Sequence, residues 1–320
     1  MTVKQKILAS IEPPVKQSKH VKIDPEKLRL LAEKIKDQEL PAWDNQLQFL
    51  GNIEQTIQYY FFLDSINFCF WAEKGKEKWQ YPRNSGWISG YYAFSFAIKR
   101  FFENNPEFFD AGKMADISFR QFKEIFAGKG ELQLLEKRHE IIRENFRILS
   151  GKYQGQAANL AKQALGDVSH LVESIVDDFP SFQDISQLGG NKIYFLKRAQ
   201  IFASDIYYAL KNAEPLNFKN LNDLTLFADY KIPQLLCAEG VLRYSQALTD
   251  KISAETLITA GSEEEIEIRA FTVLAGELLL AELEKLGRKL NSNQLDWILW
   301  VLAKNTRFTM PHHLTLTTYY

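Results

Sequence analysis

Ile57-Gln-Tyr-Tyr-Phe-Phe-Leu-Asp-Ser-Ile-Asn-Phe-Cys-Phe-Trp-Ala72 is the stretch of sequence that decides the fold class. It is apolar on almost every side, which is typical of a buried helix, with a buried strand as the less favoured alternative. Asp64 and Asn67 interrupt it three residues apart, so on a helix they share a face. Both need partners inside the protein, either as a structural polar pair or as substrate contacts, and the two alternatives stay open.

Helical spacing recurs through the rest of the chain. Asp24 and Pro25 give an N-cap and a first turn to a helix over 25–37, and Ser262 with Glu265 gives a capping box. Gly287 is a plausible C-cap for that later helix, and Asn291-Ser292 can cap the last one. The remaining expected helices are 87–102, 116–125, 132–149, 157–179, 192–210, 234–248, 266–286 and 294–303.

No run of strands, no βαβ alternation and no internal repeat is visible. The sequence therefore predicts an all-α protein with a single compact multi-helix domain over 21–320. We expect residues 1–20 to form an irregular N-terminal arm, because Pro13-Pro14 interrupts it.

Composition excludes several classes of function. The net charge of −1 over 320 residues gives no basic excess for sustained binding to a nucleic-acid duplex. No apolar run approaches the roughly 20 residues of a membrane span, and the N-terminus lacks the apolar core of a signal peptide. Cys69 and Cys237 lie in apolar runs and read as buried thiols of a reducing compartment, so we expect a cytoplasmic protein.

The motifs of phosphate loops, dinucleotide folds, zinc sites and serine-nucleophile elbows are missing from the sequence, so we predict no cofactor and no metal. What remains is a set of isolated polar residues in aromatic-rich segments. These are Asp64, Asn67, Lys197, Asp229 and Asp296. Such groups can line a pocket for a flat polar ring, and carboxylates suit a reaction that builds positive charge at a sugar carbon.

Asp229 lies in the stretch Leu226-Phe-Ala-Asp-Tyr-Lys-Ile-Pro-Gln234, just before the helix expected over 234–248. An aspartate at this place can simply cap its own turn. A charged group among apolar neighbours also costs free energy unless it is paired or used. The positive end of the helix dipole favours its ionised form, and both readings remain open on this stretch alone.

Nine short motifs in order through the chain resemble the queuosine-salvage protein family. They are Leu63-Asp-Ser-Ile-Asn-Phe-Cys-Phe-Trp71, Trp87-Ile-Ser-Gly-Tyr-Tyr92, Leu135-Glu-Lys-Arg-His139, Phe179-Pro-Ser-Phe182, Phe195-Leu-Lys-Arg-Ala-Gln200, Phe227-Ala-Asp-Tyr-Lys-Ile-Pro-Gln234, Glu267-Ile-Arg269, Leu295-Asp-Trp297 and Tyr319-Tyr320. The resemblance implies a helical fold similar to that of helical DNA glycosylases. It also implies hydrolysis of queuosine 5′-monophosphate, a small-molecule substrate, to queuine and ribose 5-phosphate.

The resemblance further implies roles for particular residues. The family's catalytic aspartate falls on Asp229, and an active-site lysine falls on Lys197. A base-stacking aromatic falls on Phe227, and a second acidic base contact with its following aromatic falls on Asp296 and Trp297. We add Tyr230, Asp64 and Asn67 as candidate substrate-binding residues.

The chain departs from the family pattern at two places. Val301 replaces a further acid, and Gln46 and Gln48 stand in the stretch 43–49, where a histidine is expected. Two other functions remain as alternatives, a nucleic-acid base glycosylase and a queuine-binding protein without activity. The sequence gives no indication of the oligomeric state.

Overall fold

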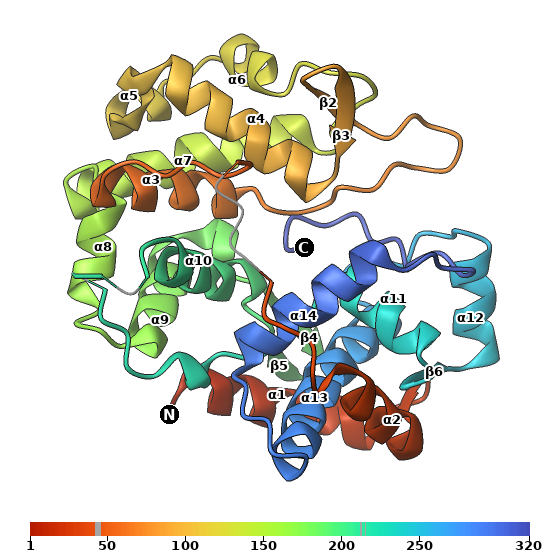
Figure 1. Ribbon diagram of the computed structural model, residues 1–320. Coiled ribbons are helices and arrows are strands. Elements are labelled where there is room, and N and C mark those ends of the chain that lie inside the picture. Colours follow the sequence, from red (N-terminus) through yellow and green to blue (C-terminus); the bar gives the residue numbers. More distant parts are fainter. Residues whose placement is uncertain (42–45, 212, 215) are drawn as a thin grey trace.

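The computed structural model describes residues 1–41, 46–211, 213–214 and 216–320, and its described part is mostly helical. Figure 1 shows the helices surrounding the centre of the molecule, with the C-terminus near that centre. The α-helices of the described residues are α1 (Val3–Lys16), α2 (Pro25–Ile35), α3 (Ile53–Ser65), α4 (Tyr91–Asn104), α5 (Ala111–Ala115), α6 (Phe119–Ile125), α7 (Leu135–Tyr153), α8 (Ala157–Gln163), α9 (Val168–Asp178), α10 (Lys197–Ala209), α11 (Lys231–Ala238), α12 (Gln246–Ser253), α13 (Glu263–Lys285) and α14 (Ser292–Asn305).

Three antiparallel two-stranded sheets supplement the helices. Strand β1 (Val21–Ile23) pairs with β6 (Leu242–Tyr244), so it joins two segments that lie far apart in the sequence. Strands β2 (Gln80–Arg83) and β3 (Gly86–Ser89) form one hairpin, and β4 (Ile185–Leu188) and β5 (Asn191–Tyr194) form another. Each sheet is too small to form a layer, so the prediction of a helical architecture is confirmed with these additions.

Helix α13 separates two hydrophobic cores. Its residues Ile266, Ala270 and Val273, spaced four and three apart, belong to the larger core around α3, α4, α7 and α10. Its residues Ile268 and Phe271 belong to the smaller core around α2, α11, α12 and α14. A helix that is apolar on both sides in this way must be buried, and here it forms a wall shared by both cores.

The N-terminal segment is a helix, so the prediction of an irregular arm over residues 1–20 is wrong. Val3, Ile7 and Ile11 repeat every four residues and are buried in the larger core. Pro13 and Pro14 lie in the last turn of α1, where they lack the N–H groups that would bond to the carbonyls of Ala9 and Ser10. The free energy gained by burying the apolar face of α1 therefore outweighs the free-energy cost of two prolines in the helix.

Helix α3 ends at Ser65, seven residues before the end of the predicted helix over 57–72. The chain beyond it is irregular, and Cys69 has a φ of 48°. The carbonyl groups of this irregular segment find a partner in Arg138 of α7. Its buried guanidinium donates to the carbonyls of Ile66, Phe68 and Cys69. A partner 70 residues away in the sequence thus ends the helix, which local spacing does not reveal.

Several other predicted helices are shorter than expected or interrupted. The predicted helix over 87–102 begins at Tyr91, because 86–89 is strand β3, and that over 192–210 begins at Lys197 after strand β5. The helix predicted over 157–179 is broken at Gly166, which has a φ of 76°. The helix predicted over 234–248 begins earlier, at Lys231, and strand β6 interrupts it.

The predicted helix ends are largely confirmed where a side chain caps the backbone locally. Asp24 accepts hydrogen bonds from the N–H groups of Glu26 and Lys27, and Asn291 caps α14 with a full capping box. Ser262 accepts from the N–H of Glu265, as predicted. The Glu265 carboxylate accepts from the N–H of Gly261, so this box is completed one residue earlier than in the usual pattern.

Candidate active site

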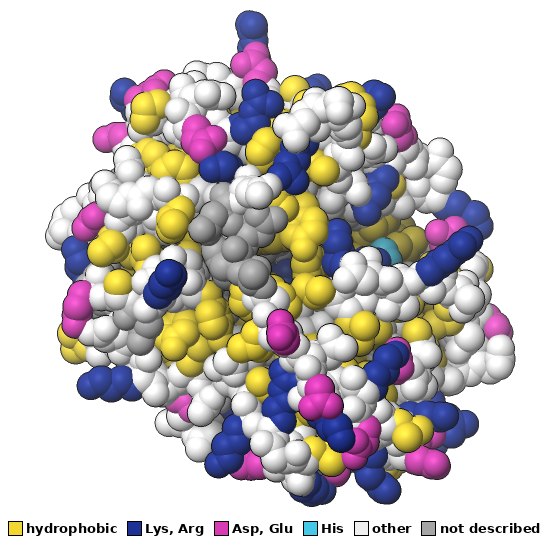
Figure 2. All heavy atoms as spheres, in the orientation of Figure 1, with side chains coloured by type: hydrophobic (Ala, Val, Ile, Leu, Met, Phe, Trp, Pro, Cys, Tyr) yellow, Lys and Arg dark blue, Asp and Glu magenta, His cyan; other side chains and the backbone are white. Residues whose placement is uncertain are grey.

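A cavity of about 210 Å³ lies where the two cores meet. Figure 2 shows a hollow near the middle of one face, bordered by hydrophobic and basic side chains. One face of α10 and one face of α14 provide much of its wall. Successive lining residues are one, three or four apart along each helix, and they are Lys197, Ile201, Ser204, Asp205 and Tyr208 from α10 and Asn293, Asp296, Trp297, Trp300 and Lys304 from α14.

Asp229 lines this cavity just before α11. Its Oδ1 atom accepts hydrogen bonds from the N–H groups of Lys231 at 2.7 Å and Ile232 at 2.9 Å, so it does cap the helix. None of the described residues donates a hydrogen bond to Oδ2. Burial raises the pKa of Asp229, while Lys197 and the two N–H donors act to lower it. Capping therefore leaves one carboxylate oxygen available to a ligand.

Lys197 is buried at the first turn of α10 and faces the same cavity. Its Nζ atom donates to the carbonyl of Asn67 at 3.2 Å. Burial lowers the pKa of Lys197, and Asp229 is the largest influence that opposes this shift. The structure thus brings together the two residues predicted to be catalytic.

Asp296 and Phe227 are connected by a hydrogen bond. The Phe227 N–H donates to Oδ1 of Asp296 at 2.9 Å, which fixes the loop before Asp229 against α14. Burial raises the pKa of Asp296 well above its ordinary value, although the Phe227 N–H opposes this shift. Trp297 and Tyr230 line the same cavity, and the Tyr230 ring lies 4.4 Å from that of His312.

Asp64 and Asn67 form the buried polar pair that their spacing suggests. Asn67 donates from Nδ2 to Oδ1 of Asp64 at 3.1 Å. Asn67 lines the cavity, whereas Asp64 lies behind it. Burial raises the pKa of Asp64 to about 7, and Asn67, Lys197 and Arg198 act in the opposite direction. The pair therefore lies in the wall, with only its amide member at the surface of the cavity.

Asp205 and Asn293 are among the polar lining residues that are absent from the predicted site. Asp205 lies eight residues after Lys197, and Asn293 three residues before Asp296, so helical spacing places each on the same side of its helix as a predicted residue. That spacing is the signal that sequence analysis missed. Asn293 is 3% exposed, and neither its amide nitrogen nor its amide oxygen has a partner among the described residues.

Three lysines gather at the mouth of the cavity, namely Lys78, Lys231 and Lys304. None of them forms an ion pair within 4.0 Å with a carboxylate of the described residues. Burial lowers the pKa of Lys304, and the neighbouring charges of Lys78 and Lys231 lower it further. Unpaired like charges at close range disfavour one another, so this cluster is suited to an anionic ligand.

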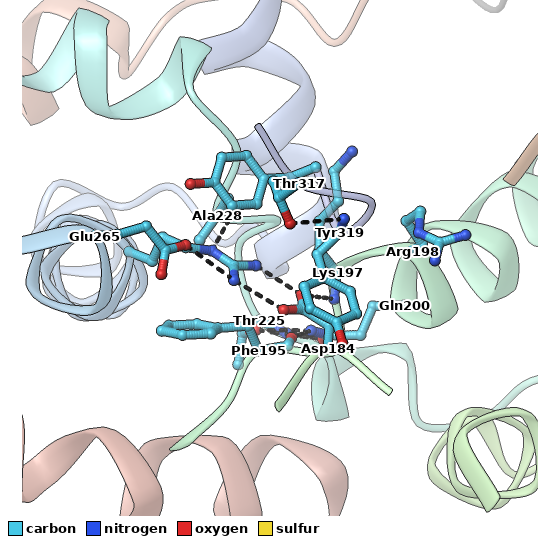
Figure 3. Close-up of polar contacts among 12 residues, drawn as sticks. Asp184, Phe195, Lys197, Arg198, Gln200, Thr225, Ala228, Glu265, Thr317 and Tyr319 are labelled. Carbon is cyan, nitrogen blue, oxygen red and sulfur yellow. Dashed lines mark hydrogen bonds and ion pairs between the residues drawn. The ribbon is translucent and has the colours of Figure 1, made fainter. Parts of the chain in front are cut away.

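A buried ion pair supports both halves of the predicted catalytic pair. Arg269 of α13 donates to Asp184 at 2.8 Å and 2.6 Å through its two Nη atoms, and its Nε donates to the carbonyl of Ala228 at 3.1 Å. Asp184 also accepts the N–H of Lys197 at 3.0 Å. Figure 3 shows Asp184 beside Lys197, with the Ala228 carbonyl on the other side of the network. The pair thus holds the backbone of Lys197 and of the residue before Asp229.

The family departures lie at different distances from the cavity. Gln48 lines it and donates to the Tyr91 hydroxyl at 2.9 Å, whereas Gln46 accepts a hydrogen bond from Arg83. Val301 is not among the described lining residues. Residues 43–45 of the stretch in which a histidine was expected lie outside the described residues.

The described part of the chain contains no group of three or more His, Cys, Asp or Glu side chains that could hold a metal ion. None of its helices has the length and apolar character needed to cross a membrane.

Comparison with known proteins connects this geometry to a family. Residues 45–320 match the family model described as queuosine salvage protein. The chain is 35% identical over 317 residues to the queuosine 5′-phosphate N-glycosylase/hydrolase of Sphaerobacter thermophilus, covering 98% of this chain and 97% of that one. It is 32% identical to the protein of the same name from Mus musculus, covering 95% of each chain. The chain therefore belongs to the queuosine salvage protein family.

Proposed function

We propose that this protein hydrolyses the N-glycosidic bond of queuosine 5′-phosphate and releases queuine and ribose 5-phosphate. The observation that carries the proposal is the pairing of Asp229 and Lys197 in one cavity, in a chain that covers 97% of a relative named for this reaction. The cysteines of the described residues, Cys69 and Cys237, are both free thiols, which agrees with a reducing cytoplasmic setting.

We assign to Asp229 the stabilisation of a sugar cation. The base of queuosine is a 7-deazaguanine, so carbon replaces the N7 atom that normally takes a proton as a purine leaves. Most of the catalysis must then act on the sugar. In our proposal, the C1′–N9 bond breaks with its electron pair going to the base, and the Asp229 carboxylate stabilises or captures the positive C1′. Water finally supplies the hydroxyl group at C1′ and a proton.

The ends of the cavity suit the two ends of such a nucleotide. We assign the 5′-phosphate to Lys78, Lys231 and Lys304, because these amines gather at the mouth and pair with no carboxylate of the residues that the structure describes. We assign the base to the aromatic side chains Phe227 and Trp297, which line the same cavity, with Asp296 beside the ring. In this proposal Lys197 keeps the Asp229 carboxylate in position and contacts the ribose.

A nucleic-acid base glycosylase is the alternative enzyme, by analogy with the proposed likeness to helical DNA glycosylases. The net charge of −1 does not favour it, because duplex binding requires a basic surface. A queuine-binding protein without activity is the second alternative.

One experiment separates these functions. The purified protein is incubated with queuosine 5′-phosphate, and in parallel with tRNA that contains queuosine, and the released base is measured by mass spectrometry. We expect queuine from the free nucleotide and none from the tRNA. Release from tRNA alone would favour the nucleic-acid glycosylase, and no release from either would favour the binding protein.

The Asp229→Asn variant tests the role of the carboxylate. The amide keeps the capping acceptor for Lys231 and Ile232, so the fold should persist, but it removes the charge opposite C1′. We expect kcat to fall by about 10³-fold or more, in line with the loss of a preorganised electrostatic group. Asp177→Asn, on an exposed part of α9, serves as the matched control and should keep full activity. Normal turnover by Asp229→Asn would contradict the assignment.

A further inference from the structure

Asp205 is a carboxyl group in the cavity that the proposed reaction does not use. It lines the cavity from α10, and its Oδ2 atom is buried without a hydrogen-bond partner among the described residues. Burial and the nearby carboxyl groups of Asp64 and Asp296 raise the pKa of Asp205 well above its ordinary value, and Lys197 opposes them. A buried carboxyl oxygen without a hydrogen-bond partner is costly, so this position suits a partner that the described residues do not supply.

Asn293 is a second, independent group of the same kind. It comes from α14, is 97% buried, and leaves both its donor and its acceptor atoms without partners in the described part of the chain. Buried amides are nearly always hydrogen-bonded. The unused donor and acceptor of Asn293 therefore indicate a ligand that presents an acceptor and a donor close together.

The two residues lie at the end of the cavity opposite to the lysines. Eleven residues separate Asn293 from Lys304, which is roughly 16 Å along α14. The contact between the rings of Tyr208 and Trp297, at 5.8 Å, brings the second half of α10 to the first half of α14. A nucleotide with its phosphate on the lysines thus directs its base, and the substituent of that base, toward Asp205 and Asn293.

The substituent of the queuine base has matching chemistry. It is an aminomethyl group on C7 that carries a cyclopentene ring with two neighbouring hydroxyl groups, and its secondary amine is cationic near neutral pH. A carboxylate close to aromatic rings is a common way to bind an ammonium ion. A single amide can donate to one hydroxyl of a diol and accept from the other.

We propose that Asp205 binds the secondary ammonium group of the base substituent and that Asn293 binds its diol. The proposal rests on the proposed function, because it takes the substrate from there. It makes these two residues the determinants that distinguish queuine from a plain 7-deazaguanine, while Asp229 and Lys197 act on the part that all such nucleotides share.

The test measures the binding of free bases by calorimetry, so that it does not depend on turnover. The three bases are queuine, 7-aminomethyl-7-deazaguanine, which has the amine without the diol, and 7-deazaguanine, which has neither. The wild-type protein should bind them in that order of affinity. Asp205→Asn should weaken binding of the two amine-bearing bases by about tenfold or more and change binding of 7-deazaguanine less than twofold. Asn293→Ala should weaken binding of queuine alone.

Equal affinity of the wild type for the three bases would overturn the proposal. So would an equal loss for all three bases in either variant, because the residue would then act on the ring or on the fold. Thermal melting of each variant identifies a folding defect, and Asp205→Glu, which keeps the charge, should retain more affinity for the amine-bearing bases than Asp205→Asn. Failure of the wild type to release queuine, with the order of affinities intact, would contradict the proposed hydrolysis but not this subsite.

Discussion

Replacing Asp184 by asparagine should damage both the stability and the catalysis of this protein. The side chains of Asp184 and Arg269 are 2% and 1% exposed and form two short hydrogen bonds. Burial alone would lower the pKa of Arg269, but Asp184 and Glu265 hold it above its ordinary value. An arginine side chain stays protonated in proteins, so the guanidinium remains charged when the Asp184 carboxylate is lost, and it is left in the interior with a weaker set of partners.

The size of the loss follows from what remains around Arg269. Removing one partner of a buried pair costs about 3–5 kcal/mol. Glu265 stays 3.5 Å from Nη1 of Arg269, which keeps the expected loss near the lower end of that range. At about 2–4 °C per kcal/mol, a loss of about 3 kcal/mol lowers the melting temperature by about 6–12 °C.

Catalysis should fall as well, because the pair holds the backbone of Lys197 and of Ala228. A displacement of about 1 Å at a reacting group can cost about 100-fold in rate. We expect kcat for queuosine 5′-phosphate to drop by about 10–100-fold at a temperature where the variant is folded. KM should change much less, because neither Asp184 nor Arg269 lines the cavity.

The assay combines thermal unfolding with steady-state kinetics. Glu140→Gln provides the matched control, because it breaks the exposed ion pair with Lys137, and such pairs contribute about 0–1 kcal/mol. A melting temperature of Asp184→Asn equal to that of the control would refute the stability argument. A destabilised variant with unchanged kcat would refute the positioning role, since the pair would then support only the fold.

Three further predictions concern the cavity and its surroundings. Lys304→Gln should raise KM for queuosine 5′-phosphate about tenfold and leave the rate with the unphosphorylated nucleoside unchanged; equal effects on both would remove Lys304 from the phosphate site. The activity should fall on acidification with a midpoint above 3.8, the ordinary pKa of an aspartate, because burial raises the pKa of Asp229. Lys197→Gln removes a charge that lowers this pKa, so the midpoint of its residual activity should move to higher pH. Gly276→Ala should destabilise the protein by about 1–3 kcal/mol, because its Cβ would lie 2.1 Å from a Leu226 side-chain atom, whereas Gly151→Ala meets nothing within 4 Å and should stabilise by up to about 1 kcal/mol.

The sequence predicts helix ends correctly where a capping side chain lies close in sequence to the backbone groups that it caps. Asp24 and Asn291 cap the helices that their positions predict, because the capping side chain and the capped N–H groups lie within three residues. The end of α3 was missed because its partner, Arg138, comes from another helix. Helix α1 was missed because the penalty of Pro13 is visible in the sequence, whereas the core that buries Ile7 is not.

In the candidate site, too, sequence motifs predict some residues, whereas others become apparent only from how the helices pack. The resemblance pointed to Asp229, Lys197 and Asp296, and the structure brings all three to one cavity. Asp205 and Asn293 were missed because an acid or an amide in a helix usually faces solvent. Only the arrangement of α10 and α14 shows that both face a shared interior space, although their spacing from Lys197 and Asp296 already placed them on the right faces.

The separation of charge along the cavity explains why a rigid support is needed around it. Lysines that have no carboxylate partner among the described residues gather at one end, and Asp205 and Asp296 lie toward the other, so like charges repel one another in the cavity and a bound nucleotide would offset that repulsion. Groups held in such an arrangement tend to move apart unless their backbones are fixed. The Asp184–Arg269 pair fixes the segments between these two ends, because it joins the backbone of Lys197 and of the residue before Asp229 to α13, the helix shared by both cores. By restraining the backbone, this buried pair thus preserves a charge distribution that is unfavourable in the free protein and complementary to the substrate.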